Sequence, residues 1–167
     1  MKLCTPRALH FIGLLAVVLL LGLSEYVQIH DGVIPCPLCL LQRFVLAALG
    51  VIFFFGMAAT LRKLGQWSAA LLVLLFSSLG ILLAGRQVWL QHLPASQAPD
   101  CGMSLQYLLQ ALPFWEAIKK VLIGSAECSQ KTWEFLHLSL AEWSLAWFVF
   151  FILLAIGLMW RTCRQGN

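Results

Sequence analysis

Charged side chains are scarce in this sequence. Lysine, arginine, aspartate and glutamate together make up 11% of its 167 residues, whereas 61% are hydrophobic. An ordinary soluble domain has about a quarter of its residues charged, because its surface must face water. The scarcity of charge therefore excludes an ordinary soluble domain and predicts a chain whose outer surface lies in a lipid bilayer.

Long apolar runs take the place of a charged surface. A helix needs roughly 17 to 25 residues to cross a hydrocarbon core about 30 Å thick. Runs of about that length cover residues 11–28, 44–61, 68–85 and 144–160. We therefore predict an all-α membrane protein, a four-transmembrane-helix bundle that forms a single integral membrane domain over residues 1–167.

A cleavage site is missing after the first apolar run. Lys2 and Arg7 precede this run, as basic residues do in secretory signal peptides. No small-residue motif of the A-x-A kind follows it, and Glu25 with Tyr26 is typical of a span that reaches the membrane interface. We therefore expect the first run to be retained as a membrane helix.

Acidic residues are missing from one side of the predicted bundle. With four spans, both termini share a side with the turn between the second and third spans. The basic residues on that side are Lys2, Arg7, Arg62, Lys63, Arg161 and Arg164. Such an excess of Lys and Arg marks cytoplasmic segments, so both termini are predicted to be cytoplasmic and the loops of residues 29–39 and 86–143 to face outward. The net charge of +4 is then a topology signal and indicates no nucleic-acid partner.

The six cysteines divide between the two sides. Cys4 and Cys163 fall on the cytoplasmic side, where thiols stay reduced, and we expect them to be unpaired thiols without a role. The other four lie on the outward, oxidising side, where they allow two disulfides. These four are Cys36, Cys39, Cys101 and Cys128.

The second outward loop has a pattern of its own. The stretch FWEAIKKVLIG, residues 114–124, places its apolar side chains near helical spacing and its charged ones elsewhere. This pattern predicts a short helix that lies in the membrane interface. The stretch HLPASQAPDC, between Gln91 and Cys101, is rich in Pro, Ala and Ser and predicts a mobile extended loop.

The stretch IPCPLCLLQRF carries the strongest chemical signal in the chain. Pro37 is favoured in a first helical turn, so Cys36 and Pro37 predict the start of the second helix. Cys39 then lies in that first turn, where free N–H groups and the helix dipole stabilise a thiolate. Arg43 follows four residues later, on nearly the same face and one turn deeper. An ionisable side chain inside a span is costly, which makes Arg43 a functional candidate.

Three interpretations of the cysteine pair remain open from chemistry alone: thiol–disulfide exchange, a structural disulfide, and half of a metal site. A zinc site needs further ligands, and the outward histidines His30, His92 and His137 have no paired spacing. A c-type haem motif is missing, because Leu40 stands where it requires histidine. For Arg43 the alternative is a side chain that snorkels to the interface. Redox exchange is the favoured interpretation.

The chain resembles a known family, the bacterial inner-membrane disulfide-formation proteins called DsbB. The resemblance runs over nearly the whole chain, and its motifs occur in the same order around four spans. Those motifs are PCPLCLLQR, RQVWLQHLP, APDCG, GSAECS and EWSLAWF. This ordered combination is far more specific than a lone C-x-x-C.

The resemblance implies a role for each outward cysteine. Cys36 and Cys39 match the pair that passes electrons to a membrane quinone, ubiquinone or menaquinone, with Cys39 as the thiolate that faces it. Cys101 and Cys128 match the pair that exchanges with the periplasmic thiol oxidase DsbA: Cys101 would form the mixed disulfide, and Cys128 would link transiently to Cys36. Arg43 matches the arginine that helps to hold the quinone and to stabilise the thiolate. The resemblance thus implies a bacterial inner membrane, with the active cysteines in the periplasm.

Weaker expectations concern other polar and aromatic residues. Glu25 and Arg86 are candidates for an ion pair across the bundle, or for separate snorkelling to the interface. His92 and Trp89 are candidates for lining the quinone site, or for interfacial anchoring.

Two other functions remain as alternatives. One is a membrane scaffold held by structural disulfides. The other is an enzyme like vitamin K epoxide reductase, which also has a C-x-x-C beside a quinone but late in the helical bundle. Here the motif opens the second span.

Overall fold

Four long helices dominate the fold. The computed structural model describes residues 5–30, 32, 36–59, 63–93, 112–123, 128 and 134–164. Within these ranges the long helices are α1 (Pro6–His30), α2 (Pro37–Ala59), α3 (Lys63–Gln91) and α7 (Leu140–Arg164). Each is long and apolar enough to cross a membrane. The predicted all-α fold with four transmembrane helices is therefore confirmed.

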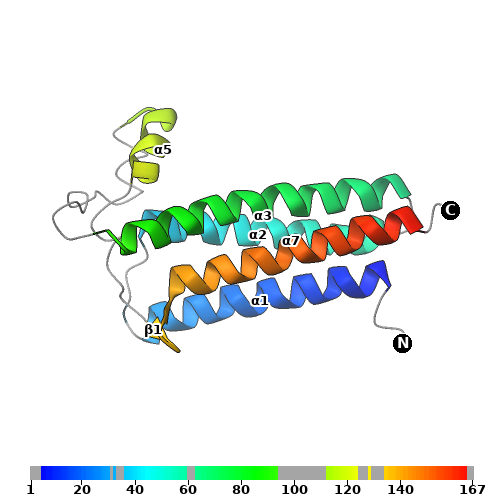
Figure 1. The fold of residues 1–167 in the computed structure, drawn as a ribbon, viewed down its shortest axis with the longest axis horizontal. Coiled ribbons are helices and arrows are strands. Elements are labelled where there is room, and N and C mark those ends of the chain that lie inside the picture. Colours follow the sequence, from blue (N-terminus) through cyan, green and yellow to red (C-terminus); the bar gives the residue numbers. More distant parts are fainter. Residues whose placement is uncertain are drawn as a thin grey trace.

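The long helices lie side by side along one axis (Figure 1). α3 packs most extensively against α7 and then against α2, while α1 packs mainly against α2. The start of α1 and the end of α7 lie at the same end of the bundle. The short helix α5 (Phe114–Ile123) and the strands β1 (Glu134–Phe135) and β2 (Leu138–Ser139) lie at the other end.

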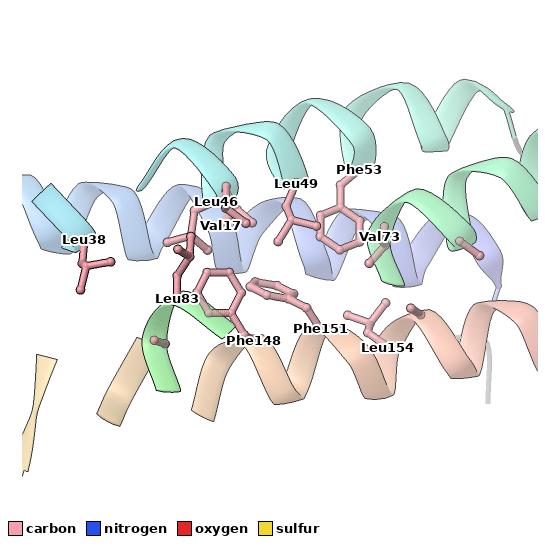
Figure 2. Close-up of a cluster of buried hydrophobic side chains, with 14 of the residues drawn as sticks. Val17, Leu38, Leu46, Leu49, Phe53, Val73, Leu83, Phe148, Phe151 and Leu154 are labelled. Atoms are coloured by element: carbon pink, nitrogen blue, oxygen red, sulfur yellow. The ribbon is translucent and has the colours of Figure 1, made fainter. Parts of the chain in front are cut away.

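The bundle interior is filled by aromatic and branched side chains (Figure 2). Phe53 of α2 and Phe148 and Phe151 of α7 are fully buried, and the ring centroids of Phe53 and Phe151 are 5.7 Å apart. Leu49 and Val73 fill the space beside them. The outward faces are also apolar, as a lipid-facing surface requires, since Leu, Val and Phe side chains are exposed along all four helices.

Glycine allows two of the aromatic rings to approach a neighbouring helix. A Cβ atom added to Gly80 of α3 would lie 2.3 Å from ring atoms of Phe148, and one added to Gly13 of α1 would lie 2.6 Å from the ring of Phe53. Small residues at such points let membrane helices pack closely without a hydrophobic driving force between them.

At most of their ends the helices continue beyond the apolar runs that predicted them. α1 starts at Pro6 rather than residue 11, α2 at Pro37 rather than residue 44, and α7 at Leu140 rather than residue 144, while α3 continues to Gln91 rather than residue 85. Hydropathy marks only the segment inside the hydrocarbon core, whereas backbone hydrogen bonding carries a helix through the headgroup region. The loops 29–39 and 86–143 were predicted as the segments outside the membrane, and these boundaries remain a prediction.

A helix does form where the second loop was predicted to contain one. α5 begins after Pro113, whose carbonyl accepts a hydrogen bond from the Glu116 N–H at 2.9 Å. Val121 is buried, whereas Trp115 and Ile123 are exposed. Its position in the membrane interface remains a prediction. The extended loop predicted between Gln91 and Cys101 lies outside the described residues, apart from His92 and Leu93.

An unpredicted hairpin with a two-residue loop precedes α7. Phe135 pairs with Leu138, and the intervening Leu136 and His137 have φ angles of 55° and 64°. Positive φ at both loop residues is the geometry that suits the twist of paired strands. The hairpin leads directly into α7 and so places the start of that helix.

Ser139 and Glu142 cap the start of α7. The Ser139 N–H donates to Glu142 Oε2 at 2.7 Å, and the Glu142 N–H donates to Ser139 Oγ at 3.3 Å. This reciprocal pair satisfies two backbone donors that an uncapped helix would leave free. The Ser139 hydroxyl also donates to Gln91 Oε1 at 2.7 Å, which ties the start of α7 to the end of α3.

Candidate functional site

Cys36 and Cys39 lie at the start of α2, as predicted. The Leu40 N–H donates to the Cys36 carbonyl at 3.1 Å, so Cys36 is the residue that caps the helix. Its sulfur accepts a hydrogen bond from the Cys39 N–H at 3.4 Å, in the place that a serine or aspartate oxygen usually takes. Pro37 occupies the first helical position, where its missing N–H costs nothing.

Three of the four predicted cysteines come together at this point. The Cys36 thiol donates to Cys39 Sγ at 3.0 Å. Cys128, which is 1% exposed, is within hydrogen-bond reach of Cys36, although the two residues are far apart in the sequence. The structure thus brings Cys128 of the second outward loop close to the cysteine pair at the start of α2. Cys101 lies outside the described residues, as does Cys4, whereas Cys163 is exposed at the far end of α7.

The surroundings of Cys36 favour its protonated form. Hydrogen bonds to Cys128 and then to Cys39, together with burial, raise the pKa of Cys36 above its ordinary value. Ionisation removes the one proton that the Cys36 thiol can donate, and the resulting charge would be poorly solvated at a residue only 4% exposed. Of this pair, Cys36 is therefore the sulfur that keeps its proton.

A buried glutamine lies directly against the cysteine pair. Gln87 Nε2, on α3, donates to Cys39 Sγ at 3.1 Å and lies 3.6 Å from Cys36 Sγ. Gln42 Nε2, on α2, donates in turn to Gln87 Oε1 at 2.7 Å. Both glutamines are 4% exposed. Neither glutamine was predicted, because both lie just outside the apolar runs 44–61 and 68–85; their place in the motifs PCPLCLLQR and RQVWLQHLP was the signal that could have found them.

Arg43 lies one turn below Cys39 and is held by α1. Its guanidinium donates to Glu25 Oε1 at 2.9 Å, to the Ser24 carbonyl at 3.0 Å and to Gln28 Oε1. The Arg43 side chain is 20% exposed and that of Glu25 is 57% exposed. The predicted cation is therefore present at the edge of the bundle, and an ion pair with α1 neutralises much of its charge.

Glu25 and Arg86, which were candidates for an ion pair or for separate snorkelling, do not pair with each other. Glu25 pairs with Arg43, whereas Arg86 donates to the carbonyls of Leu122 and Ile123, each at 3.0 Å. The last carbonyls of a helix have no partner within the helix, so a guanidinium on α3 can satisfy those of α5 and hold that helix in place. Helix rotation decided this pairing, which a linear pattern does not reveal.

The residues considered for the quinone site have other contacts in the described structure. The Arg86 guanidinium lies over the Trp89 ring, with Arg86 Cζ 4.3 Å from the ring centroid. His92 Nδ1 is 2.8 Å from the Val88 carbonyl, and its Nε2 is 4.0 Å from Glu142 Oε1. Among the described residues, no group of three or more His, Cys, Asp or Glu side chains is arranged to hold a metal ion.

Comparison with known proteins places this arrangement in a family. The family described as "Disulfide bond formation protein DsbB" matches residues 6–158. The chain belongs to the DsbB family. A disulfide bond formation protein B from Stutzerimonas stutzeri is 38% identical over 165 residues, which are 99% of each chain. Another, from Psychrobacter sp., is 41% identical and covers 96% of this chain and 95% of its own. No solved structure matches the chain.

Membership of the DsbB family fits the site geometry. The matched residues include Cys36, Cys39, Cys101 and Cys128, and they exclude Cys4 and Cys163. A third relative, disulfide bond formation protein B 1 of Pseudomonas aeruginosa, is 40% identical over 91% of this chain and 93% of its own. This DsbB-family chain is thus a membrane protein of disulfide bond formation, and its clustered sulfurs are the groups suited to that chemistry.

Proposed function

We propose that this protein reoxidises a DsbA-like periplasmic thiol oxidase and passes the electrons through two cysteine pairs to a membrane quinone. One observation carries the proposal: Cys128 is within hydrogen-bond reach of Cys36. Thiol–disulfide exchange requires a direct approach of one sulfur to another. The closeness of Cys128, from the loop pair, to Cys36, at the start of α2, supports electron transfer between the two cysteine pairs.

The exchange balances in three steps. The Cys101–Cys128 disulfide first takes two electrons from the dithiol of the partner, which leaves Cys101 and Cys128 reduced and the partner oxidised. Cys128 then attacks Cys36 of the Cys36–Cys39 disulfide and releases Cys39 as a thiolate. Attack of Cys101 on Cys128 restores the loop disulfide and releases Cys36, so that both electrons now reside on the Cys36–Cys39 dithiol.

A quinone fits the chemistry of the groups at the membrane edge. When bound, it supplies an acceptor for two electrons and two protons, which the Cys36–Cys39 dithiol loses as its disulfide reforms. Arg43, which follows Cys39 by one helical turn, would help to hold the quinone. The exposed Phe44 beside it offers an apolar surface that suits a lipid-soluble ring. Ubiquinone and menaquinone share this chemistry.

The charge distribution supports a site on the periplasmic side of the inner membrane. Arg7 and Arg161 lie in the described parts of α1 and α7 that share one end of the bundle, whereas Glu25, Glu116 and Glu142 lie towards the end with the cysteines. Basic residues favour the cytoplasmic side, so both termini are proposed to be cytoplasmic. A soluble periplasmic partner then reaches the loop that carries Cys101 and Cys128.

Anaerobic mixing of the full-length protein with a quinone and a reduced DsbA-type partner tests the proposal. We expect the quinone absorbance to fall at a rate that depends on the partner, with one quinone consumed for each partner disulfide formed. Cys39→Ser and Cys128→Ser should each reduce this turnover to background. Cys163→Ser, which changes a cysteine outside the matched residues, should leave it unchanged.

The scaffold alternative gives a different result in the same experiment. If the outward cysteines stay permanently oxidised and do not react with the reduced partner, the disulfides are structural and the proposed function is wrong.

A further inference from the structure

We propose that Gln87 is a positioning residue that holds negative charge on the sulfur of Cys39, and that Gln42 orients its amide for this task. The inference rests on the proposed function and assigns roles to two residues beyond the four outward cysteines and Arg43. Neither amide belongs to the two cysteine pairs, and each comes from a different helix.

The geometry selects Cys39 over Cys36. The Gln87 amide nitrogen is 3.1 Å from Cys39 Sγ and 3.6 Å from Cys36 Sγ, so its hydrogen bond favours the deeper sulfur. Cys36 meanwhile is the donor in its contact with Cys39, at 3.0 Å. Cys39 Sγ therefore accepts from both groups. The donors to Cys36 Sγ are more distant, with the Cys39 N–H at 3.4 Å and Gln87 Nε2 at 3.6 Å. The two shorter hydrogen bonds therefore stabilise a thiolate at Cys39 in preference to one at Cys36.

Gln42 removes the alternative orientation of the Gln87 amide. A glutamine side chain can present either its NH₂ group or its carbonyl oxygen to a neighbour. The Gln42 NH₂ group is 2.7 Å from Gln87 Oε1, so the Gln87 oxygen is occupied and its NH₂ group turns towards the sulfurs. If the Gln87 amide were rotated by half a turn, its NH₂ group would face the NH₂ group of Gln42. Its oxygen would then face the lone pairs of the cysteine sulfurs.

The burial of Gln87 and Gln42 makes the hydrogen bond to Cys39 difficult to replace. Both glutamines are 4% exposed, so water cannot readily replace a missing donor. Attack of Cys128 on Cys36 releases Cys39 with the electron pair of the broken S–S bond, and no proton accompanies it. A preorganised N–H group stabilises that developing charge without the cost of reorientation.

Gln87 and Arg43 then have separate tasks. The Arg43 guanidinium is occupied by Glu25, Gln28 and the Ser24 carbonyl on α1. The amide that donates to Cys39 Sγ comes from α3 instead. Gln87 is therefore the donor to the sulfur, whereas the role proposed for Arg43 is contact with the quinone, and kinetics should distinguish the two.

The first test measures Cys39 directly, without partner or quinone. In full-length protein with every other cysteine replaced by serine, the rate of iodoacetamide alkylation is followed against pH. Gln87→Leu should slow alkylation at pH 7 by about ten-fold, because a hydrogen bond to a charged group is lost. The pH at which the alkylation rate reaches half of its maximum should also rise. Gln87→Glu, nearly the same shape, should slow it further by placing a carboxylate against the sulfur.

Gln66→Leu is the matched control. Gln66 is also a buried glutamine of α3, but it lies at the other end of the helix and accepts a hydrogen bond from Thr162. Its replacement should leave the alkylation profile of Cys39 unchanged. If Gln87→Leu and Gln66→Leu give the same profile, or if Gln87→Glu reacts like the parent, the inference is wrong.

The second test separates kcat from KM in the turnover assay. Gln87→Leu should lower kcat about ten-fold and leave the KM for quinone unchanged, whereas Arg43→Leu should raise that KM.

Gln42→Leu should act through Gln87, so the double variant Gln42→Leu/Gln87→Leu should match Gln87→Leu within about two-fold. Equal kcat for Gln87→Leu and Gln66→Leu, or independent effects of the two glutamines, would overturn the inference. A parent protein that reduces no quinone would instead refute the proposed function, and the alkylation result would still stand.

Discussion

At the scale of single residues, Cys36 combines a structural and a chemical role. Its sulfur caps the first turn of α2, and its thiol donates to Cys39 while it remains within reach of Cys128. A sulfur that keeps its proton when reduced is a poor nucleophile. Cys36 is therefore placed to receive attack within a disulfide rather than to start it.

The raised pKa of Cys36 predicts a specific pH dependence. An ordinary cysteine has a pKa of about 8.5, so it is mostly thiolate at pH 9. In the reduced protein, alkylation of Cys36 should stay slow at pH 9, and mass spectrometry of each cysteine after timed alkylation measures this. Because the folded state keeps a proton that the unfolded state loses, the stability of the reduced protein should be full below about pH 8.5 and fall as pH rises further.

Cys128→Ala is the variant that tests the cause. It removes the hydrogen-bond partner that contributes most to the shift, so alkylation of Cys36 should become faster at pH 9. The unfolded protein in denaturing detergent provides the reference rate. If Cys36 in the folded parent reacts as fast as in the unfolded chain, its environment does not hold the proton.

At the scale of elements, the bundle depends on close contact between α3 and α7. Gly80 of α3 faces the ring of Phe148, which is fully buried. α7 also carries the capping pair Ser139 and Glu142, and Ser139 joins it to Gln91 at the end of α3. α3 also packs against α2, and this second contact brings Gln87 to the Cys39 sulfur.

Gly80→Ala should destabilise the bundle. The added Cβ would lie 2.3 Å from ring atoms of Phe148, and overpacking of this kind costs about 1 to 3 kcal/mol. Thermal unfolding of the protein in detergent measures the effect as a lower Tm. Gly157→Ala on α7 is the control, since nothing lies within 4 Å of its added Cβ and alanine favours helix. Phe148→Leu should recover part of the loss in the Gly80→Ala background, and equal Tm values for the two alanine variants would contradict the packing argument.

At the scale of the whole molecule, orientation decides which solution the sulfurs meet. Cys163 is exposed near the end of α7, and Trp115 is exposed on α5 at the opposite end of the bundle. The proposed topology places the first in the cytoplasm and the second in the periplasm. All exchange with a soluble partner depends on this arrangement.

Labelling of intact cells tests the orientation. In a background without other cysteines, a membrane-impermeant maleimide should label Trp115→Cys and leave Cys163 unlabelled. Permeabilised cells should label both positions, which controls for access. Labelling of Cys163 alone in intact cells would reverse the topology and exclude a periplasmic partner.

The sequence by itself determined the long helices and the cysteine pair at the start of the second one. Apolar runs long enough to cross a bilayer have few other stable structures, because every backbone group in lipid must be hydrogen-bonded within the segment. The start of α2 at Pro37, with Cys36 before it and Cys39 in its first turn, followed from local helix rules. The link between Cys128 and Cys36 that the DsbB resemblance implied stays a prediction, although the two residues are within hydrogen-bond reach.

Only the tertiary structure decided which polar groups meet across the bundle. Glu25 pairs with Arg43 rather than with Arg86, and Gln87 reaches Cys39 from a helix about fifty residues further along the chain. A sequence pattern gives the spacing of residues along one helix but not the rotation of that helix against its neighbours. Packing of buried side chains sets that rotation, because interiors are close-packed and tolerate few alternative fits.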